Sequence, residues 1–222
     1  MKNINVDTFY CNGDSWARGV ELENSEDSFV NVLARNYNLP IINSACPGGS
    51  NQRILRTTIE DVSKLLMQNK KPFVLISWTL PHRFELYSTD RKEFVTFSSP
   101  NSAADIELGN TIWSKWASDK TDVINFLTQV IALQSFLKQN NIPYFMTNVF
   151  KIVYELLDKS EIELYQSQID VNYYMYNLPL KVLLTPYINI EWGVDHPLKE
   201  GHSIIAKFLI EQINIRYSFN NC

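Results

Sequence analysis

The sequence contains little glycine and has no surplus of positive charge. Only 7 of its 222 residues are Gly, against 12 Phe, 11 Tyr and 5 Trp, which argues against a flexible, low-complexity chain. The formal net charge is -4 and Lys and Arg are scattered, so the chain has no general attraction to phosphate backbones. Neither a GxGxxG nor a P-loop sequence occurs, which argues against a nucleotide site. We therefore expect no nucleic-acid partner.

Cysteine is also scarce. Cys11, Cys46 and Cys222 form no CxxC pair and have no His nearby at the spacing of metal ligands. This pattern predicts a reducing compartment and no disulfide framework. Because the number is odd, at least one thiol is free. We expect neither a metal nor another cofactor.

Long hydrophobic runs are absent as well. The N-terminal stretch MKNINVDTFYCNGDS lacks the apolar region of a signal peptide. No window approaches the roughly 18 consecutive apolar residues that span a membrane. These absences predict a soluble, cytoplasmic protein without a membrane partner.

The sequence does contain an alternation of short apolar strands and amphipathic helices. The expected helix N-caps are, in chain order, Asn24 or Ser25, Ser50 or Asn51, and Thr121. The strands are expected at 8–11, 39–43, 73–77 and 144–149, and the last helix at about 199–216. This alternation predicts a single α/β domain over residues 1–222 with three layers, α/β/α, the middle one a parallel sheet. Working residues of such sheets lie at the carboxyl ends of the strands.

Residues 84–120 follow the third strand and are too long for a plain connection. They include Trp113 and Trp116. This insertion has two interpretations, which the sequence does not separate. It is a lid or substrate wall over a site, or a locally packed excursion with its own small cluster.

The first candidate for chemistry is Ser15, in the sequence Gly13-Asp14-Ser15 after the first strand. A serine at a strand-to-helix turn can hold its hydroxyl clear of the sheet, and its own N–H lies near a helix start. It then supplies a nucleophile and one donor for an oxyanion. The alternative is that Ser15 is only an N-cap.

The second candidate is His196, followed by Pro197 and by Gly201-His202 just before the last helix. A histidine in this loop can reach Ser15 at the same sheet edge and act as its base. Asp195, His196 and His202 lack a further ligand at suitable spacing, so we expect no metal here.

Together these blocks resemble the SGNH (GDSL-like) hydrolase superfamily. Its first block is similar to Gly13-Asp14-Ser15, its second to residues 43–48, and its last to residues 195–202. The glycine of the second block is Gly48, or Gly49 if the block is shifted by one residue. The resemblance implies a flavodoxin-like α/β/α fold, with the N–H groups of Ser15 and of Gly48 or Gly49 around the oxyanion. Residues 47–54 also resemble a divergent branch found in bacteriophage and bacterial genomes, which would allow association with a virion.

The third block of the family ends in an Asn that donates to the oxyanion, and this sequence departs from it. The equivalent strand end contains Thr79 and no Asn. Thr79 is the nearest hydroxyl that can substitute. Arg83 can stabilise a negative oxygen or bind an acidic substrate, or it pairs with a carboxylate such as Glu85.

The acid that orients the histidine is a second departure. The family places an Asp three residues before the His, and this position is Gly193. Three alternatives stay open: Asp195 serves, Glu191 substitutes, or Ser15 and His196 act as a dyad.

Two functions follow from the resemblance. The first is a serine esterase or carbohydrate O-deacylase that uses Ser15, His196 and Asp195 on a small-molecule or glycan acyl ester. The second is a non-catalytic glycan-binding or phage structural domain that kept the cleft and lost the full set of donors.

Overall fold

The computed structural model describes residues 1–98, 106–115, 118–152 and 158–219. Its centre is a five-stranded sheet in which every neighbouring pair is parallel. The strand order is β3 (Ile41–Asn43), β2 (Thr8–Asn12), β4 (Pro72–Trp78), β7 (Tyr144–Asn148), β8 (Tyr174–Met175). The predicted α/β class with a central parallel sheet is confirmed, and β8 is the strand of this sheet that the sequence did not reveal.

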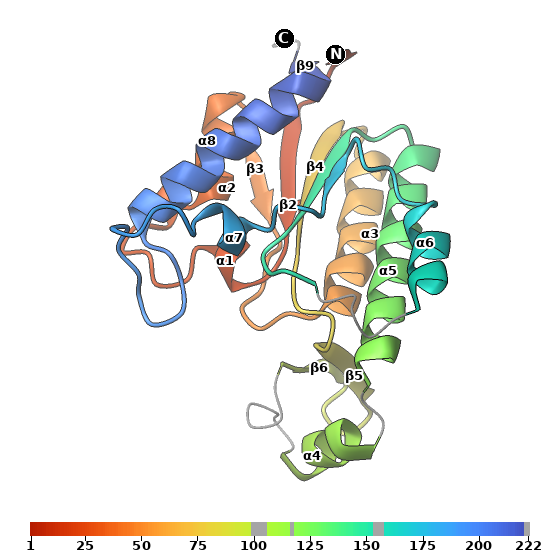
Figure 1. Cartoon of the computed structure of the whole chain (residues 1–222). Helices are drawn as coiled ribbons and strands as arrows, with labels where there is room; N and C mark the ends of the chain where they lie inside the picture. Colours follow the sequence, from red (N-terminus) through yellow and green to blue (C-terminus); the bar gives the residue numbers. More distant parts are fainter. Residues whose placement is uncertain (99–105, 116–117, 153–157, 220–222) are drawn as a thin grey trace.

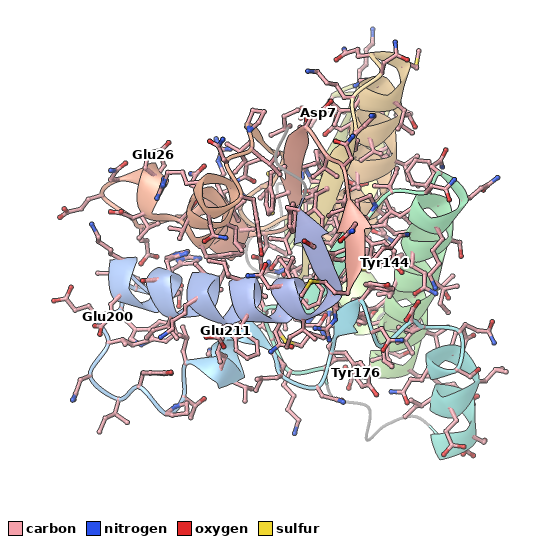
Figure 2. The ribbon with its side chains drawn as sticks, turned by 90° about the horizontal axis from the view of Figure 1, so that it is seen from above. Asp7, Glu26, Tyr144, Tyr176, Glu200 and Glu211 are labelled. Atoms are coloured by element: carbon pink, nitrogen blue, oxygen red, sulfur yellow. The ribbon has the colours of Figure 1, made fainter. Side chains whose placement is uncertain are left out.

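Helices cover both faces of the sheet (Figures 1 and 2). One face carries α1 (Ser15–Arg18), α2 (Phe29–Asn36), α7 (Leu180–Leu183) and α8 (Lys199–Arg216), with the 3-10 turn η1 (Ser25–Asp27) before α2. The other face carries α3 (Asn51–Met67), α5 (Asp119–Gln139) and α6 (Lys159–Gln166). Figure 2, in which Glu200 and Glu211 mark α8, shows α8 and α5 on opposite sides of the sheet.

The sheet separates two hydrophobic cores. In β4, Phe73 and Leu75 enter the core beneath α2 and α8, whereas Val74, Ile76 and Trp78 enter the core beneath α3 and α5. Alternate residues of a strand point to opposite faces, and all seven residues of β4 are buried. A strand covered on both faces has no polar alternation, which explains the continuous apolar run at 73–77.

Serine side chains cap α2, α3 and α5. Ser50 accepts from the N–H of Arg53 at the start of α3, as expected. The N-cap of α2 is Ser28, while Asn24 caps η1. The expectation of Thr121 was wrong, because Ser118 accepts from the Thr121 N–H and starts α5 a turn earlier.

The insertion contains a hairpin and a helix. β5 (Phe84–Ser88) and β6 (Glu93–Phe97) pair antiparallel, and α4 (Ile106–Lys115) follows. Figure 1 shows them below the sheet, at the end that carries α1 and away from the two termini. Residues 99–105 and 116–117, Trp116 among them, lie outside the described residues. The role of a lid stays a prediction.

The two ends of the chain also meet. β1 (Lys2–Ile4) pairs in parallel with β9 (Tyr217–Phe219), so the N-terminus is held beside the end of α8. Cys11 is buried and Cys46 half-buried, both as free thiols, and Cys222 lies outside the described residues. No helix in the described part of the chain combines the length and the hydropathy needed to cross a bilayer.

Candidate active site

Ser15 is the first residue of α1, directly after β2. Asp14 is the N-cap, and its carboxylate accepts from the N–H of Trp16 at 3.0 Å, so Ser15 does not serve as the cap. The Ser15 N–H donates to no described residue, as is usual for the first amides of a helix. Gly13 is required by close packing, because a Cβ there would lie 2.9 Å from the carbonyl oxygen of Ser77. The turn therefore holds Ser15 tightly at the edge of the sheet.

The loop after β3 lies beside this turn. The N–H of Cys46 donates to the carbonyl of Gly13 at 3.1 Å, and the N–H of Gly49 donates to Cys46 at 3.0 Å. Residues 46–49 form a turn with Pro47 in second place and Gly48 in third, where a φ of 69° favours glycine. The turn occupies the Gly49 N–H, whereas the Gly48 N–H has no partner among the described residues. Gly48 is thus the better placed of the two predicted donors.

Thr79, at the end of β4, joins the same edge through its side chain. Its hydroxyl donates to Asp14 Oδ2 at 2.7 Å and accepts from Arg83 Nη1 at 2.8 Å. Arg83 Nη1 also lies 3.5 Å from Asp14 Oδ2. A hydroxyl has a single proton, and Asp14 takes it. Thr79 can therefore serve as the predicted oxyanion donor only if it first breaks this bond.

Burial governs the ionisation of this group. Asp14 is fully buried, and burial raises the pKa of its carboxyl against the hydrogen bond from Thr79 and the positive charge of Arg83. Burial also lowers the pKa of the Arg83 guanidinium, although Asp14 opposes this change. The Nε of Arg83 is buried without a partner in the described part of the chain, so Arg83 retains a donor that the network does not use.

Asn51 holds the backbone of Thr79 in place. Its side-chain oxygen accepts from the Thr79 N–H at 2.9 Å, and its amide donates to the Thr79 carbonyl at 3.2 Å. Asn51 is buried at the start of α3. The sequence suggested Asn51 only as an alternative helix cap, and this anchoring role was missed.

His196 lies in the loop that leads into α8. Its Nδ1 is 2.7 Å from Oε1 of Glu21, a residue that follows α1. The hydrogen bond from His196 holds the pKa of the Glu21 carboxyl below its ordinary value. Trp192 of the same loop packs edge-on against Trp16, with ring centroids 5.8 Å apart. The His196 loop is thus attached to the segment that begins with Ser15.

Five of the predicted site residues lie in segments that hydrogen bonds connect to one another beyond the carboxyl ends of the strands: Ser15, Gly48, Gly49, Thr79 and Arg83. Asp195 is exposed to solvent, and the carboxylate in contact with His196 belongs to Glu21. The catalytic roles of all these residues stay predictions.

A cavity of about 280 Å³ lies next to Thr79 along the chain, beyond the end of β4. Burial, together with the charge of Asp119, raises the pKa of Asp122 to about 6. Burial and the charge of Arg83 lower the pKa of His82. The cavity is lined by Leu80, Pro81, His82, Asp119, Asp122, Val123, Lys151 and Ile152.

The model of one protein family, described as a family of unknown function (DUF6071), matches residues 18–216. The chain belongs to this family. Glu21 and His196 lie within the matched residues of DUF6071, and Ser15 lies just before them. A search of curated proteins found no significant match.

Solved structures similar to this DUF6071 chain have the SGNH (GDSL) fold. The psychrotrophic esterase EstA from Pseudoalteromonas sp. is 15% identical with a TM-score of 0.53, and the match covers 94% of this chain and 97% of that one. A putative lipolytic protein of the G-D-S-L family from Desulfitobacterium hafniense is 15% identical with a TM-score of 0.53, over 92% and 98%. The acetyl xylan esterase Est2A from Butyrivibrio proteoclasticus is 10% identical with a TM-score of 0.57, over 96% of this chain and 65% of that one. The matches establish the fold and give no support to a bacteriophage setting.

Proposed function

We propose that the chain is a serine hydrolase that cleaves an acyl ester, either as an esterase or as a carbohydrate O-deacylase. One observation carries the proposal: the His196 loop is attached, through Glu21 and Trp16, to the segment that begins with Ser15. This attachment supports a site in which a candidate nucleophile and a candidate base from opposite ends of the chain meet. The similarity in fold to an acetyl xylan esterase supports an ester of a carbohydrate as the substrate class.

The proposed reaction has two steps. In the first, Ser15 Oγ attacks the ester carbonyl while His196 takes the hydroxyl proton, and that proton then passes to the departing alcohol. In the second, His196 takes a proton from water, the hydroxide attacks the acyl carbonyl, and the carboxylic acid leaves as Ser15 regains its proton. The N–H groups of Ser15 and Gly48 donate to the oxyanion in both steps.

Arg83 and the cavity beyond β4 would act on the substrate. Arg83 keeps an unused donor beside the network that ties Asp14 to Thr79, and it supplies positive charge near the oxyanion. The cavity beginning at Leu80 accepts the part of the ester that does not react. Its lining carries both the half-buried Asp122 and Lys151, so we expect it to accept a neutral group.

A second function, a non-catalytic glycan-binding domain, is favoured by one specific observation. The Thr79 proton is held by Asp14, so the hydroxyl that replaces the family's Asn is not free to donate to an oxyanion. Loss of one oxyanion donor costs on the order of 10²–10³ in rate. A structural domain of a virion is the other form of this alternative.

The test is labelling with a fluorophosphonate, followed by mass spectrometry of the peptide that contains Ser15. Only an activated serine reacts with the probe: its Oγ forms a bond to phosphorus, and fluoride leaves the phosphorus. We expect wild type to be labelled at Ser15, and Ser15→Ala to lose both the label and the hydrolysis of p-nitrophenyl acetate and acetylated xylan. An unlabelled wild type that binds xylan without deacylating it would establish the binding domain instead.

A further inference from the structure

The contact between Glu21 and His196 joins two segments that lie 175 residues apart in the sequence. The side chains are partly shielded from water, with exposed fractions of 26% for Glu21 and 12% for His196. A hydrogen bond between a carboxylate and an imidazole nitrogen determines which ring nitrogen carries the proton. Because Glu21 holds Nδ1, Nε2 is the nitrogen left to exchange a proton with Ser15.

Both oxygens of Glu21 are used by the loop that carries His196. Oε1 contacts His196 Nδ1, and Oε2 accepts from the N–H of Val194 at 2.6 Å. The backbone of Glu21 has a φ of 71°, a conformation that residues with a side chain rarely adopt. Backbone outliers of this kind occur preferentially at functional sites. Two hydrogen bonds therefore hold the carboxylate of Glu21 to the loop.

Gly193 explains why the carboxylate can approach so closely. A Cβ at position 193 would lie 1.7 Å from Oε2 of Glu21, so the carboxylate fills the space in which a side chain of residue 193 would begin. The Gly193 N–H donates to the His196 carbonyl at 2.9 Å, which closes the loop around this point. Gly193 is three residues before His196, at the position where the SGNH resemblance places an aspartate. A carboxylate from the start of the chain thus occupies the place of a local acid.

We propose that Glu21 is the positioning residue of His196. Its carboxylate holds the proton of the imidazole on Nδ1 and balances the positive charge that the ring acquires when Nε2 takes the Ser15 proton. This inference rests on the proposed function. It assigns to Glu21 the role that the sequence left open between Asp195, Glu191 and a dyad. Glu21, Glu191 and Asp195 are all exposed residues, and among them Glu21 is the one whose carboxylate contacts His196.

The experiment uses the full chain and two readouts: p-nitrophenyl acetate hydrolysis and the rate of fluorophosphonate labelling at Ser15. In Glu21→Gln, the amide can donate to Nδ1 and so favours the wrong tautomer. We expect kcat and the labelling rate to fall by about 10²-fold or more, while KM changes less than threefold, because Glu21 does not touch the substrate. The matched control is Glu200→Gln, which removes an exposed carboxylate from the first turn of α8 and should leave both rates within about twofold of wild type. Asp195→Asn is made as well, to test the competing carboxylate.

A rescue variant separates positioning from a structural role. Glu21→Ala opens the space over Gly193, and the double variant Glu21→Ala/Gly193→Asp places a carboxylate in that space from the other segment. We expect the double variant to hydrolyse p-nitrophenyl acetate at least tenfold faster than Glu21→Ala does. Thermal unfolding by circular dichroism identifies any variant that fails to fold. The positioning role is then judged from the rates of those variants that do fold.

The outcomes distinguish this inference from the function on which it rests. If wild type is not labelled at Ser15, both fail together. If labelling depends on Ser15 but Glu21→Gln retains wild-type rates, the proposed function stands and the positioning role is overturned. Loss of activity in Asp195→Asn with normal activity in Glu21→Gln would transfer the role to Asp195.

Discussion

The hydroxyl of Thr79 donates its proton to the fully buried carboxylate of Asp14, at 2.7 Å. Because Asp14 also caps α1, this bond connects the end of β4 to the helix that begins with Ser15. Arg83 completes the connection through its contacts with both residues. Thr79, which stands where an Asn was expected, therefore holds the turn that carries Ser15 to the sheet.

Replacement of Asp14 by Ala is expected to reduce stability strongly. The change removes a helix cap and leaves the half-buried Arg83 without its carboxylate, and breaking a buried pair in this way costs about 3 kcal/mol or more. Asp158→Ala is the matched control, because Asp158 caps α6 through the N–H of Ser160 on an exposed surface, at a cost of about 1 kcal/mol. Urea unfolding measures both. Equal losses in the two variants would contradict the buried network.

Gly13→Ala tests the close approach of α1 to β4. The new methyl group would lie 2.9 Å from the Ser77 carbonyl oxygen and 2.8 Å from the Cβ of Ala17. Neither can retreat without moving a helix or a strand, so overpacking should cost about 3 kcal/mol. In Gly48→Ala the methyl group has room, at 3.7 Å from Ser98, and only the left-handed backbone resists, at about 1 kcal/mol. If Gly13→Ala and Gly48→Ala both lower the free energy of unfolding by only about 1 kcal/mol, the turn at Gly13 adapts to the added methyl group.

Most of the fold was predictable because the apolar pattern repeats with the period of each element. The run at 73–77 and the stripe of the last helix became β4 and α8, since burial imposes their sequence directly. The short strands β8, β1 and β9 were missed, because a strand of two or three residues is too short to show a repeating apolar pattern. The hairpin β5–β6 was missed because it was treated as one irregular insertion.

The candidate site was predictable where a motif is local and was missed where it depends on tertiary contact. Ser15 and His196 stood out because each lies in a short, recognisable block. Glu21 carries no such signal: it lies in an irregular loop, and only folding brings it to His196. The Gly at position 193 was the one indirect sign, since it marks the place where another group needs space.

Arg56 is expected to hold the β5–β6 hairpin against α3. Its guanidinium binds Glu85 through two bonds, Nε to Oε1 at 2.9 Å and Nη2 to Oε2 at 3.1 Å, and lies over the ring of Phe94 at 3.9 Å. Lys cannot reproduce this fork. Arg56→Lys should therefore accelerate amide hydrogen exchange in residues 84–97 by about tenfold, or roughly 1.4 kcal/mol of local opening free energy. In Arg35→Lys, which alters the exposed pair with Glu26, exchange in the hairpin should not change, and faster exchange there would exclude a specific effect of Arg56.

His202 is buried in a setting that accepts only its neutral form. Its Nδ1 accepts from the N–H of Phe29 at 3.1 Å, and its ring stacks on that of Phe29 with centroids 5.7 Å apart. Nε2 is buried without a partner among the described residues. Burial, reinforced by the nearby His196 and opposed by Asp27, lowers the pKa of His202 to about 4.

Stability should consequently fall as the pH drops below about 6.5, because the unfolded chain then binds a proton at His202 that the folded chain refuses. The loss is negligible at pH 7.5 and amounts to about 2 kcal/mol by pH 5. His202→Asn keeps an acceptor for the Phe29 N–H and cannot be protonated, so its free energy of unfolding should be lower at pH 7.5 but should decline less steeply. Urea unfolding of both proteins at intervals between pH 7.5 and 5 gives the two slopes. Parallel slopes would mean that His202 takes up its proton in the folded protein as easily as in the unfolded one, and that the stacked ring tolerates the charge.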